Sequence, residues 1–275
     1  MTNPELAFIM RSDEMIREFG MERMTVETSR GSVDRCFVGE VFGVPVAILY
    51  GRFGDRKTPS NMIDFSQNVE AVVRLGARKL VGTFVVGGIS PARSAGSVYV
   101  LGDLVGMGGY RVPLDAAEDF HNAEMYRPFC RELTARLERA ARTVCPQVVT
   151  NATYVCFHGW PRIETAAELA FYDKMGWDVV GQTCDPEATI ARLHGLCYAG
   201  IAVQIDEPRL RSSAAEGGSV RLAADNSLTI RDCRKRTTAV VLQMIRDYSP
   251  FSCQQCLRGK RTNRSFRKLP DWYYD

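Results

Sequence analysis

The sequence predicts an α/β protein, with a central mixed β-sheet flanked by helices over residues 1–250 and a basic, aromatic tail over residues 251–275. Short apolar runs of strand length recur along the chain. They alternate with longer segments in which apolar residues repeat at helical spacing, which is the pattern of α/β folds. With 275 residues, the chain is long enough to bury a substantial core.

The first fifty residues are expected to form three strands and one short helix. Leu6–Met10 is an apolar run that fits a first strand, and Asp13 can cap a short helix after it. Cys36–Glu40 and Val44–Tyr50 flank Gly43, an arrangement typical of a hairpin.

The middle of the chain is expected to alternate helices and strands. Ile63–Leu75 carries apolar residues at helical spacing, and Glu124–Val144 has the pattern of a long amphipathic helix. Lys79–Val86 and Val98–Val105 are apolar runs of strand length. Gly87-Gly88, directly after the first run, predicts a tight turn.

The last part of the predicted domain places polar residues at two strand ends. The elements expected there are strands at Thr150–Phe157, Val179–Val180 and Tyr198–Ile205, and helices at Ile163–Met175, Pro186–His194 and Leu228–Tyr248. A polar turn including Gln182 and Thr183 follows one strand, and Asp206 follows another. Since ligands in open α/β sheets are held at the carboxyl ends of strands, we expect a binding site there.

The composition excludes several classes of protein. The net charge of +3 is too small to indicate a nucleic-acid partner by itself. The sequence has no apolar run long enough to span a membrane and no signal-peptide pattern at its start, so a cytoplasmic location is expected. The nine cysteines are an odd number with mostly wide spacing, and a disulfide framework is not expected.

Cys253-x-x-Cys256 is a pair at metal-ligand spacing, and Cys233 or His194 could supply further ligands. Because a structural zinc site needs four ligands and only one such pair exists, we expect no metal. The basic tail beside this pair could bind RNA or an acidic partner, but we expect it to dock on a neighbouring subunit.

Two blocks of sequence resemble a known family. Asp178-Val-Val-Gly-Gln-Thr-Cys-Asp-Pro-Glu187 and Cys197-Tyr-Ala-Gly-Ile-Ala202 are similar to the methylthioadenosine phosphorylase branch of the purine nucleoside phosphorylases. Supporting blocks stand in the same order along the chain: Gly51-Arg-Phe-Gly54, Thr58-Pro-Ser60, Val86-Gly-Gly88, Pro128-Phe-Cys130 and Pro161-Arg162. The resemblance implies a nucleoside phosphorylase-like fold, a homotrimer and a small-molecule substrate.

The resemblance also assigns roles to residues. Asp206 stands where the family has the carboxyl group that protonates the leaving purine, a general acid. Arg52 stands at the position of the phosphate arginine, and Thr183 is retained. His121 lies near the histidine that reaches into a neighbouring subunit's pocket.

Several positions depart from the family pattern. Phe53 replaces a histidine, Phe84 or Val85 replaces a phosphate-binding threonine or serine, and Pro208 replaces a second aspartate. Ile163 stands in place of an aromatic residue and Gln182 in place of a methionine. Met10-Arg-Ser-Asp-Glu14 replaces the glycine-rich phosphate loop. Burying a phosphate dianion against two phenyl rings would cost roughly several kcal/mol. We therefore expect no cofactor, and we do not expect ordinary use of phosphate as a co-substrate.

The sequence is compatible with three functions. The leading hypothesis is a pentosyltransferase-like enzyme that acts at the N-glycosidic bond of a purine nucleoside, methylthioadenosine-like, or of a related glycoside. The alternatives are a phosphate-independent nucleosidase, and a relative recruited to different, biosynthetic chemistry or to non-catalytic ligand binding. Phosphate-dependent base release would indicate the first, and phosphate-independent release would indicate the second.

Overall fold

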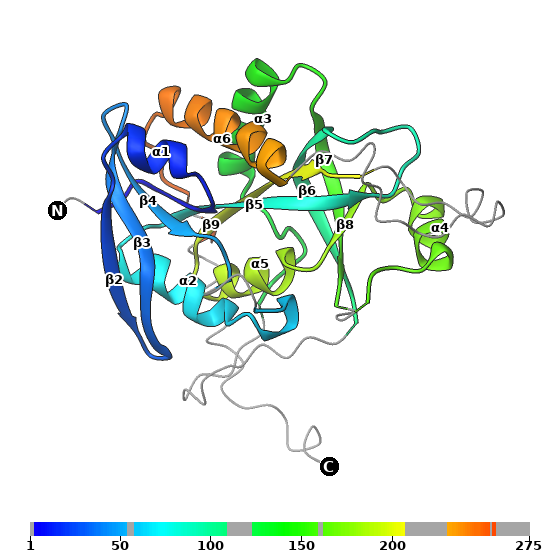
Figure 1. Cartoon of the computed structure of the whole chain (residues 1–275), viewed down its shortest axis with the longest axis horizontal. Coiled ribbons are helices and arrows are strands. Elements are labelled where there is room, and N and C mark those ends of the chain that lie inside the picture. The colour runs from blue at the N-terminus through cyan, green and yellow to red at the C-terminus, as the bar shows by residue number, and fades with distance from the viewer. Residues whose placement is uncertain are drawn as a thin grey trace, which may run out of the picture.

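The computed structural model describes residues 3–53, 58–108, 123–158, 162–206, 230–253 and 255–256. In these residues nine strands form one mixed sheet in the order β2-β3-β4-β1-β5-β8-β7-β6-β9, which confirms the predicted fold class (Figure 1). The strands are β1 (Leu6–Met10), β2 (Glu22–Thr28), β3 (Gly31–Val41), β4 (Val44–Tyr50), β5 (Lys79–Gly88), β6 (Val98–Met107), β7 (Val149–Phe157), β8 (Val179–Gly181) and β9 (Cys197–Gln204). None of the described helices has the length and apolar character needed to cross a membrane.

Strand β5 closes part of this sheet on itself. It pairs in parallel with β1 on one side and, from Lys79 to Val86, in parallel with β9 on the other. Its last two residues, Gly87 and Gly88, pair antiparallel with β8. Because β9 also pairs with β6, the strands from β5 to β9 form a closed ring. Strands β1, β4, β5 and β9 are mutually parallel, so their carboxyl ends lie at the same edge.

Helices cover both faces of the sheet. They are α1 (Asp13–Glu18), the 3-10 turn η1 (Ser60–Met62), α2 (Phe65–Arg74), α3 (Arg131–Val144), α4 (Ala166–Lys174), α5 (Cys184–Leu193) and α6 (Ile230–Arg246). In Figure 1, α3 and α6 lie above the central strands, and α2 and α5 lie below them. Val69 of α2 and Ala188 of α5 belong to one buried cluster, and Leu137 of α3 and Val241 of α6 belong to a second.

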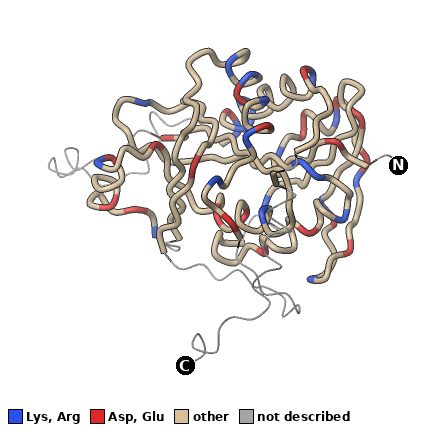
Figure 2. The backbone as a smooth tube through the Cα atoms, turned by 180° about the vertical axis from the view of Figure 1, so that it is seen from behind, with Lys and Arg blue, Asp and Glu red and all other residues tan. Residues whose placement is uncertain are grey.

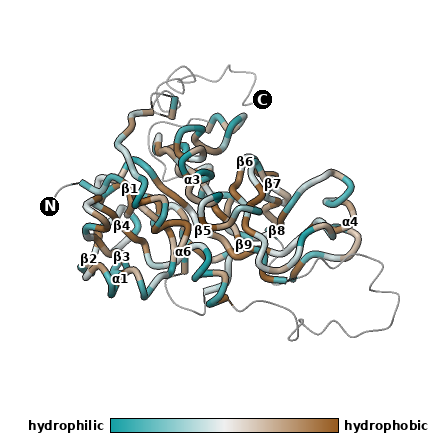
Figure 3. Tube along the Cα trace, turned by 90° about the horizontal axis from the view of Figure 1, so that it is seen from above, coloured by the Kyte–Doolittle hydropathy of each residue, from teal (hydrophilic) through white to brown (hydrophobic). Residues whose placement is uncertain are grey.

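Polarity follows this layering. Figure 3 shows the hydrophobic stretches concentrated in the central strands, with hydrophilic residues along the outer parts of the helices. Figure 2 shows basic and acidic residues interspersed over the described chain.

Two predicted elements are wrong in detail, and one strand was missed. Helix α3 begins at Arg131 rather than at residue 124 because Pro128 disfavours helical geometry in the residue before it. Gly87 and Gly88 extend β5 instead of forming a turn. A Cβ atom on Gly88 would lie 2.1 Å from Nε2 of Gln204, so a close approach between strands explains that glycine. Strand β2 was not predicted, since most of its residues are exposed and polar.

The structure also corrects the predicted N-cap of the first helix and shows where part of the C-terminal tail lies. The N-cap of α1 is Ser12 rather than Asp13, because the Ser12 hydroxyl accepts a hydrogen bond from the Met15 amide at 3.2 Å. Of the predicted tail, Phe251, Cys253 and Cys256 pack against the cluster that holds α3 and α6. The described part of the tail therefore lies against its own domain.

Candidate active site

A cavity of about 1200 Å³ lies at the carboxyl ends of the parallel strands β1, β4, β5 and β9. Its lining includes every site residue expected from the sequence that the structure describes: Arg52, Phe53, Phe84, Val85, Ile163, Gln182, Thr183 and Asp206. His121 and Pro208 lie outside the described residues. The fold thus brings together side chains from five separate segments of the sequence.

Asp206 is held at the end of β9 by its neighbours. Its side-chain Oδ1 accepts a hydrogen bond from the Gly88 amide at 3.4 Å, and its backbone carbonyl accepts one from Nε2 of Gln204 at 2.7 Å. Gln204 is fully buried, and its Oε1 accepts a hydrogen bond from the Tyr99 hydroxyl at 2.6 Å. This buried network fixes the backbone that carries the Asp206 carboxyl group into the cavity.

A second carboxyl group, Glu164, shares the cavity with Asp206. Burial raises the pKa of Glu164, and the negative charges of Asp206 and Glu168 raise it further. A carboxyl group whose pKa is raised keeps its proton to higher pH, so Glu164 can serve as a second proton donor in the cavity. His158 is not among the residues that line the cavity.

The turn after β8 contributes Gln182 and Thr183. The Ser60 hydroxyl donates a hydrogen bond to the Gln182 side-chain carbonyl, which orients the amide. The Thr183 amide donates to the Tyr154 hydroxyl at 3.4 Å. Thr183 is the N-cap residue of α5, yet its side chain makes no capping hydrogen bond to that helix. These two side chains present an amide and a hydroxyl group at the cavity wall.

Arg52 is tied into the protein by a buried network. Its Nε donates to Glu187 Oε2 at 2.6 Å, its NH2 nitrogen donates to Glu187 Oε1 at 2.8 Å, and its NH1 nitrogen donates to the Thr83 carbonyl at 2.7 Å. Glu187 is fully buried and Arg52 is only 8% exposed. The Tyr198 hydroxyl also donates to Glu187 Oε1, at 2.7 Å. Arg52 and Glu187 therefore form a bidentate ion pair, and the Tyr198 hydroxyl donates a third hydrogen bond to the Glu187 carboxylate.

The electrostatics of this network follow from its burial. Burial alone would lower the pKa of Arg52, but the adjacent Glu187 carboxylate outweighs burial and raises that pKa. Burial also raises the pKa of Tyr198 well above its ordinary range, so the phenol stays neutral and can donate. The positive charge of Arg52 is compensated within the protein before any ligand arrives.

Comparison with known proteins identifies the family and supports the fold. The sequence profile of the family described as "Phosphorylase superfamily" matches residues 6–246. The chain belongs to the phosphorylase superfamily. The resemblance to purine nucleoside and methylthioadenosine phosphorylases seen in the sequence is thereby confirmed.

Individual relatives support this membership. The 6-oxopurine nucleoside phosphorylase of Pyrococcus furiosus is 33% identical over 187 residues, which cover 65% of this chain and 70% of the relative. A probable S-methyl-5'-thioinosine phosphorylase of Methanothermobacter thermautotrophicus is 28% identical over 257 residues, covering 92% and 88%. The crystal structure of a methylthioadenosine phosphorylase from an antarctic soil metagenomic library has a TM-score of 0.75 at 26% identity, covering 89% of this chain and 86% of that one.

One wall of the cavity in this phosphorylase-superfamily chain is apolar. Phe84 is buried beneath Arg52, with the guanidinium carbon 4.2 Å from the ring centroid, and it packs edge-on against Tyr154. Phe53 packs against the same core, whereas Val85 is 38% exposed. Phe84 therefore covers Arg52 as a structural partner, and Val85 presents its side chain to the cavity.

A set of basic residues was only partly foreseen from the sequence. Those lining the cavity besides Arg52 are Arg11, Arg17, Arg231, Arg234 and Lys235. Arg11 and Ser12, which belong to the segment that stands in place of the glycine-rich phosphate loop, line the cavity. Positive charge is thus supplied by α6, by α1 and by the turn after β1, and these side chains can attract an anionic group.

Sequence reasoning missed Glu187 and Tyr198 as members of the site. Both stand inside the two blocks that carried the family resemblance, so the signal was present. What the sequence lacked was the pairing, because Glu187 and Arg52 are 135 positions apart. Only the fold brings the end of β4 against the first turn of α5.

Proposed function

We propose that this chain is an enzyme that acts at the N-glycosidic bond of a purine nucleoside, methylthioadenosine-like, or of a related glycoside. The observation that carries the proposal is the cavity at the strand ends, where the Asp206 carboxyl group faces the same space as the polar side chains of Gln182 and Thr183. The names of relatives that act on purine nucleosides and on methylthioadenosine support the same chemistry.

The proposed roles follow from what bond cleavage requires. The leaving purine gains electrons and needs a proton or a hydrogen bond, which Asp206 supplies as general acid. The sugar becomes oxocarbenium-like, and a nucleophile must approach its opposite face. Gln182 and Thr183 hold the sugar hydroxyl groups, and Ile163 together with Val85 gives apolar contact to the base or to a 5' substituent. Arg52, Phe53 and Phe84 shape the floor of the cavity.

A second candidate function is cleavage in which phosphate is not the nucleophile. It is favoured by one observation: Arg52 donates three hydrogen bonds to protein oxygens, and the Glu187 carboxylate compensates its charge. A phosphate dianion at this position would find less free positive charge than an unpaired arginine offers. In this case water or another acceptor attacks the sugar, and no cofactor is required.

Base release measured with and without phosphate separates the two. Inosine, adenosine, methylthioadenosine and methylthioinosine are incubated with the enzyme in phosphate-free buffer and then with added phosphate. Release that requires phosphate supports a phosphorylase, and equal release in both buffers supports a nucleosidase. If no nucleoside is cleaved and none raises the melting temperature of the protein, the proposal is wrong.

The role of Asp206 is tested by Asp206→Asn, which keeps the shape of the side chain and removes the proton donor. We expect kcat to fall by about 10² to 10⁴-fold, the usual contribution of a general acid. Asp103→Asn is the matched control, because Asp103 is exposed and lies outside the cavity lining. If both variants keep full activity, Asp206 does not protonate the leaving base.

The homotrimer and the cytoplasmic location expected from the sequence belong to the same proposal, as does the role of His121 in a neighbouring subunit's site. Ile163 and Ile230 line the cavity while 53% and 49% exposed, an apolar rim that a second subunit could cover. Light scattering on the purified chain tests the trimer, and microscopy of a tagged chain tests the location. A monomer with full activity would contradict the assembly.

A further inference from the structure

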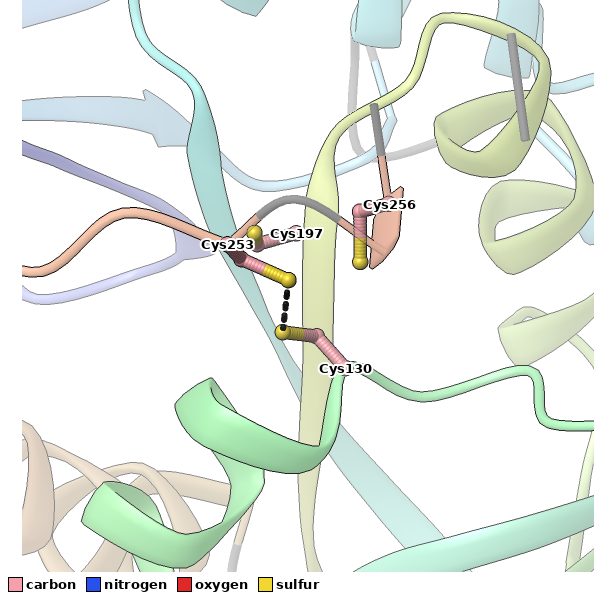
Figure 4. A group of neighbouring side chains, drawn as sticks. All are labelled: Cys130, Cys197, Cys253 and Cys256. Atoms are coloured by element: carbon pink, nitrogen blue, oxygen red, sulfur yellow. Dashed lines mark hydrogen bonds between the residues drawn. The ribbon is translucent and has the colours of Figure 1, made fainter. Parts of the chain in front are cut away.

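Four cysteines from three distant parts of the chain meet at one point. They are Cys130, Cys197, Cys253 and Cys256, and their sulfur atoms all lie within 4.8 Å of one another (Figure 4). The sequence suggested only the last two, with Cys233 or His194 as partners. The structure replaces those partners with Cys130 and Cys197.

The spacing of the sulfur atoms fits a single tetrahedral ion. With zinc–sulfur bonds of about 2.3 Å, the edge of the tetrahedron is about 3.8 Å. The Sγ atoms of Cys130 and Cys253 are 3.8 Å apart. An iron–sulfur cluster distributes its thiolates over several irons and needs a wider cage. The geometry is therefore that of a mononuclear site.

Two of the four thiols are fixed by the domain itself. Cys130 is the N-cap residue of α3, and its amide donates to the Tyr198 carbonyl at 2.7 Å. Cys197 begins β9, and its amide donates to the Arg78 carbonyl at 3.0 Å. A thiolate is favoured at the amino end of a helix, where backbone amides point outward. Half of the site thus stands on regular secondary structure.

The other two thiols come from the segment that follows α6. The ring of Phe251 anchors this segment, with the Arg136 guanidinium carbon 4.2 Å and the Lys79 nitrogen 5.0 Å from its centroid. Cys256 is buried and Cys253 is half-buried. In Figure 4 Cys253 and Cys256 lie on opposite sides of the start of β9, and a dashed line joins the sulfur atoms of Cys253 and Cys130. The segment is positioned to close the coordination shell.

The meeting of four thiols, three of them buried, needs an explanation. All four are free cysteines, and a thiol is a weak hydrogen-bond donor and acceptor. Elsewhere a buried cysteine such as Cys36 lies among apolar residues as a small hydrophobic side chain. Packing alone stabilises an approach of four sulfur atoms only slightly. A cation bound by all four would stabilise it strongly, because thiolates are the preferred ligands of a closed structural zinc site.

We propose that Cys130, Cys197, Cys253 and Cys256 bind one zinc ion, which fastens the C-terminal segment to the start of β9 and to α3. All four ligands come from the protein, so no position stays open for substrate or water and the ion has a structural role. Binding converts the thiols to thiolates and releases their protons to solvent. Cys197 and Asp206 stand nine positions apart along an extended strand, about 30 Å, so the ion takes no part in the chemistry at the cavity.

The first test is the metal content of the full-length protein. Purified without chelator, the wild-type protein should contain one zinc ion per chain by elemental mass spectrometry. The Cys256→Ser variant should contain little or no zinc. Cys145→Ser is the matched control and should keep it, because Cys145 lies at the other end of α3, outside the cluster. Zinc that is absent from wild type, or retained in Cys256→Ser, overturns the proposal, and iron in its place overturns the choice of ion.

A second test does not depend on the folding of a variant. The wild-type protein is stripped with chelator and titrated with cobalt. Thiolate-to-cobalt charge-transfer bands and the strong visible bands of tetrahedral cobalt should appear at one equivalent and disappear when zinc is added. Octahedral cobalt spectra overturn the proposal. A disulfide between any two of the four cysteines, found by alkylation under denaturing conditions without reductant, also overturns it.

A third comparison uses the accessible ligand. Cys253 is half-buried, so Cys253→His can place an imidazole at the same vertex and should retain zinc, as Cys₃His sites do. Cys253→Ser should bind zinc more weakly and melt at a lower temperature. Chelator should lower the melting temperature of wild type and Cys145→Ser, and it should not shift that of Cys256→Ser. An equal response to chelator in all variants contradicts the site.

Discussion

Replacing Glu187 by glutamine should destabilise the fold strongly, although the change removes no heavy atom. Glu187 is fully buried, and its two carboxylate oxygens accept hydrogen bonds from Arg52 and Tyr198. In Glu187→Gln one of these oxygens becomes an NH₂ group that faces an N–H donor. The Arg52 charge then loses its counter-ion in a region shielded from water.

The structure sets the expected size of the effect. Removing one partner of a buried ion pair costs about 3–5 kcal/mol, because the remaining charge is uncompensated. For a chain of this size about 2 °C of melting temperature corresponds to 1 kcal/mol, so the loss is about 6–10 °C. The double variant Arg52→Met/Glu187→Leu should recover most of the loss, since a packed apolar pair of similar volume is often neutral relative to the ion pair.

Urea unfolding of the wild type, Glu187→Gln and the double variant measures the free energy of unfolding directly. Glu132→Gln is the control, because Glu132 is 56% exposed and lies 3.6 Å from Arg136 in a surface pair that is worth at most about 1 kcal/mol. If Glu187→Gln loses no more stability than Glu132→Gln, the idea that Arg52 depends on Glu187 for compensation is refuted.

Two further predictions concern the cavity. Burial and the charge of Asp206 raise the pKa of Glu164 in the folded protein. The stability that Glu164 contributes is therefore fully present below its unfolded pKa and is lost as the pH rises through its folded pKa. Glu164→Gln should flatten this part of a plot of melting temperature against pH, and parallel plots for the variant and the wild type would contradict the shift. Gly88→Ala should cost about 1–3 kcal/mol and reduce kcat, because the new Cβ atom displaces Gln204. Gly106→Ala is its control, since the nearest atom there lies 3.5 Å away, and equal unfolding free energies for both alanine variants would show that Gln204 moves aside freely.

The strands were predictable where both faces are buried. Every residue of β9 is buried, and such a strand appears in the sequence as an uninterrupted apolar run. Strand β2 was missed because a partly exposed edge strand has no such run. The start of α3 was missed because its helical periodicity extends past the point where Pro128 stops the helix.

The candidate site was predictable to the extent that its residues directly follow strands. Asp206 stands two positions beyond β9, and parallel strands gather such positions at one edge. Gln182 stands one position beyond β8, which is antiparallel to β5 but pairs with its last two residues, Gly87 and Gly88, and so ends near the same place. Pairings across the chain were not predictable. Arg52 with Glu187 and Cys130 with Cys253 are separated by 135 and 123 positions, and no local pattern encodes which distant partner each will meet.

The closure of β5 on β9 leaves β2 as the one strand of the described chain with a single partner strand. An unpaired strand edge is a template for edge-to-edge association and aggregation. Here that edge carries Glu22, Arg23 and Glu27, and a bulge interrupts its register between Met24 and Val26. Charge and distortion make this edge a poor template for pairing with a strand of another chain.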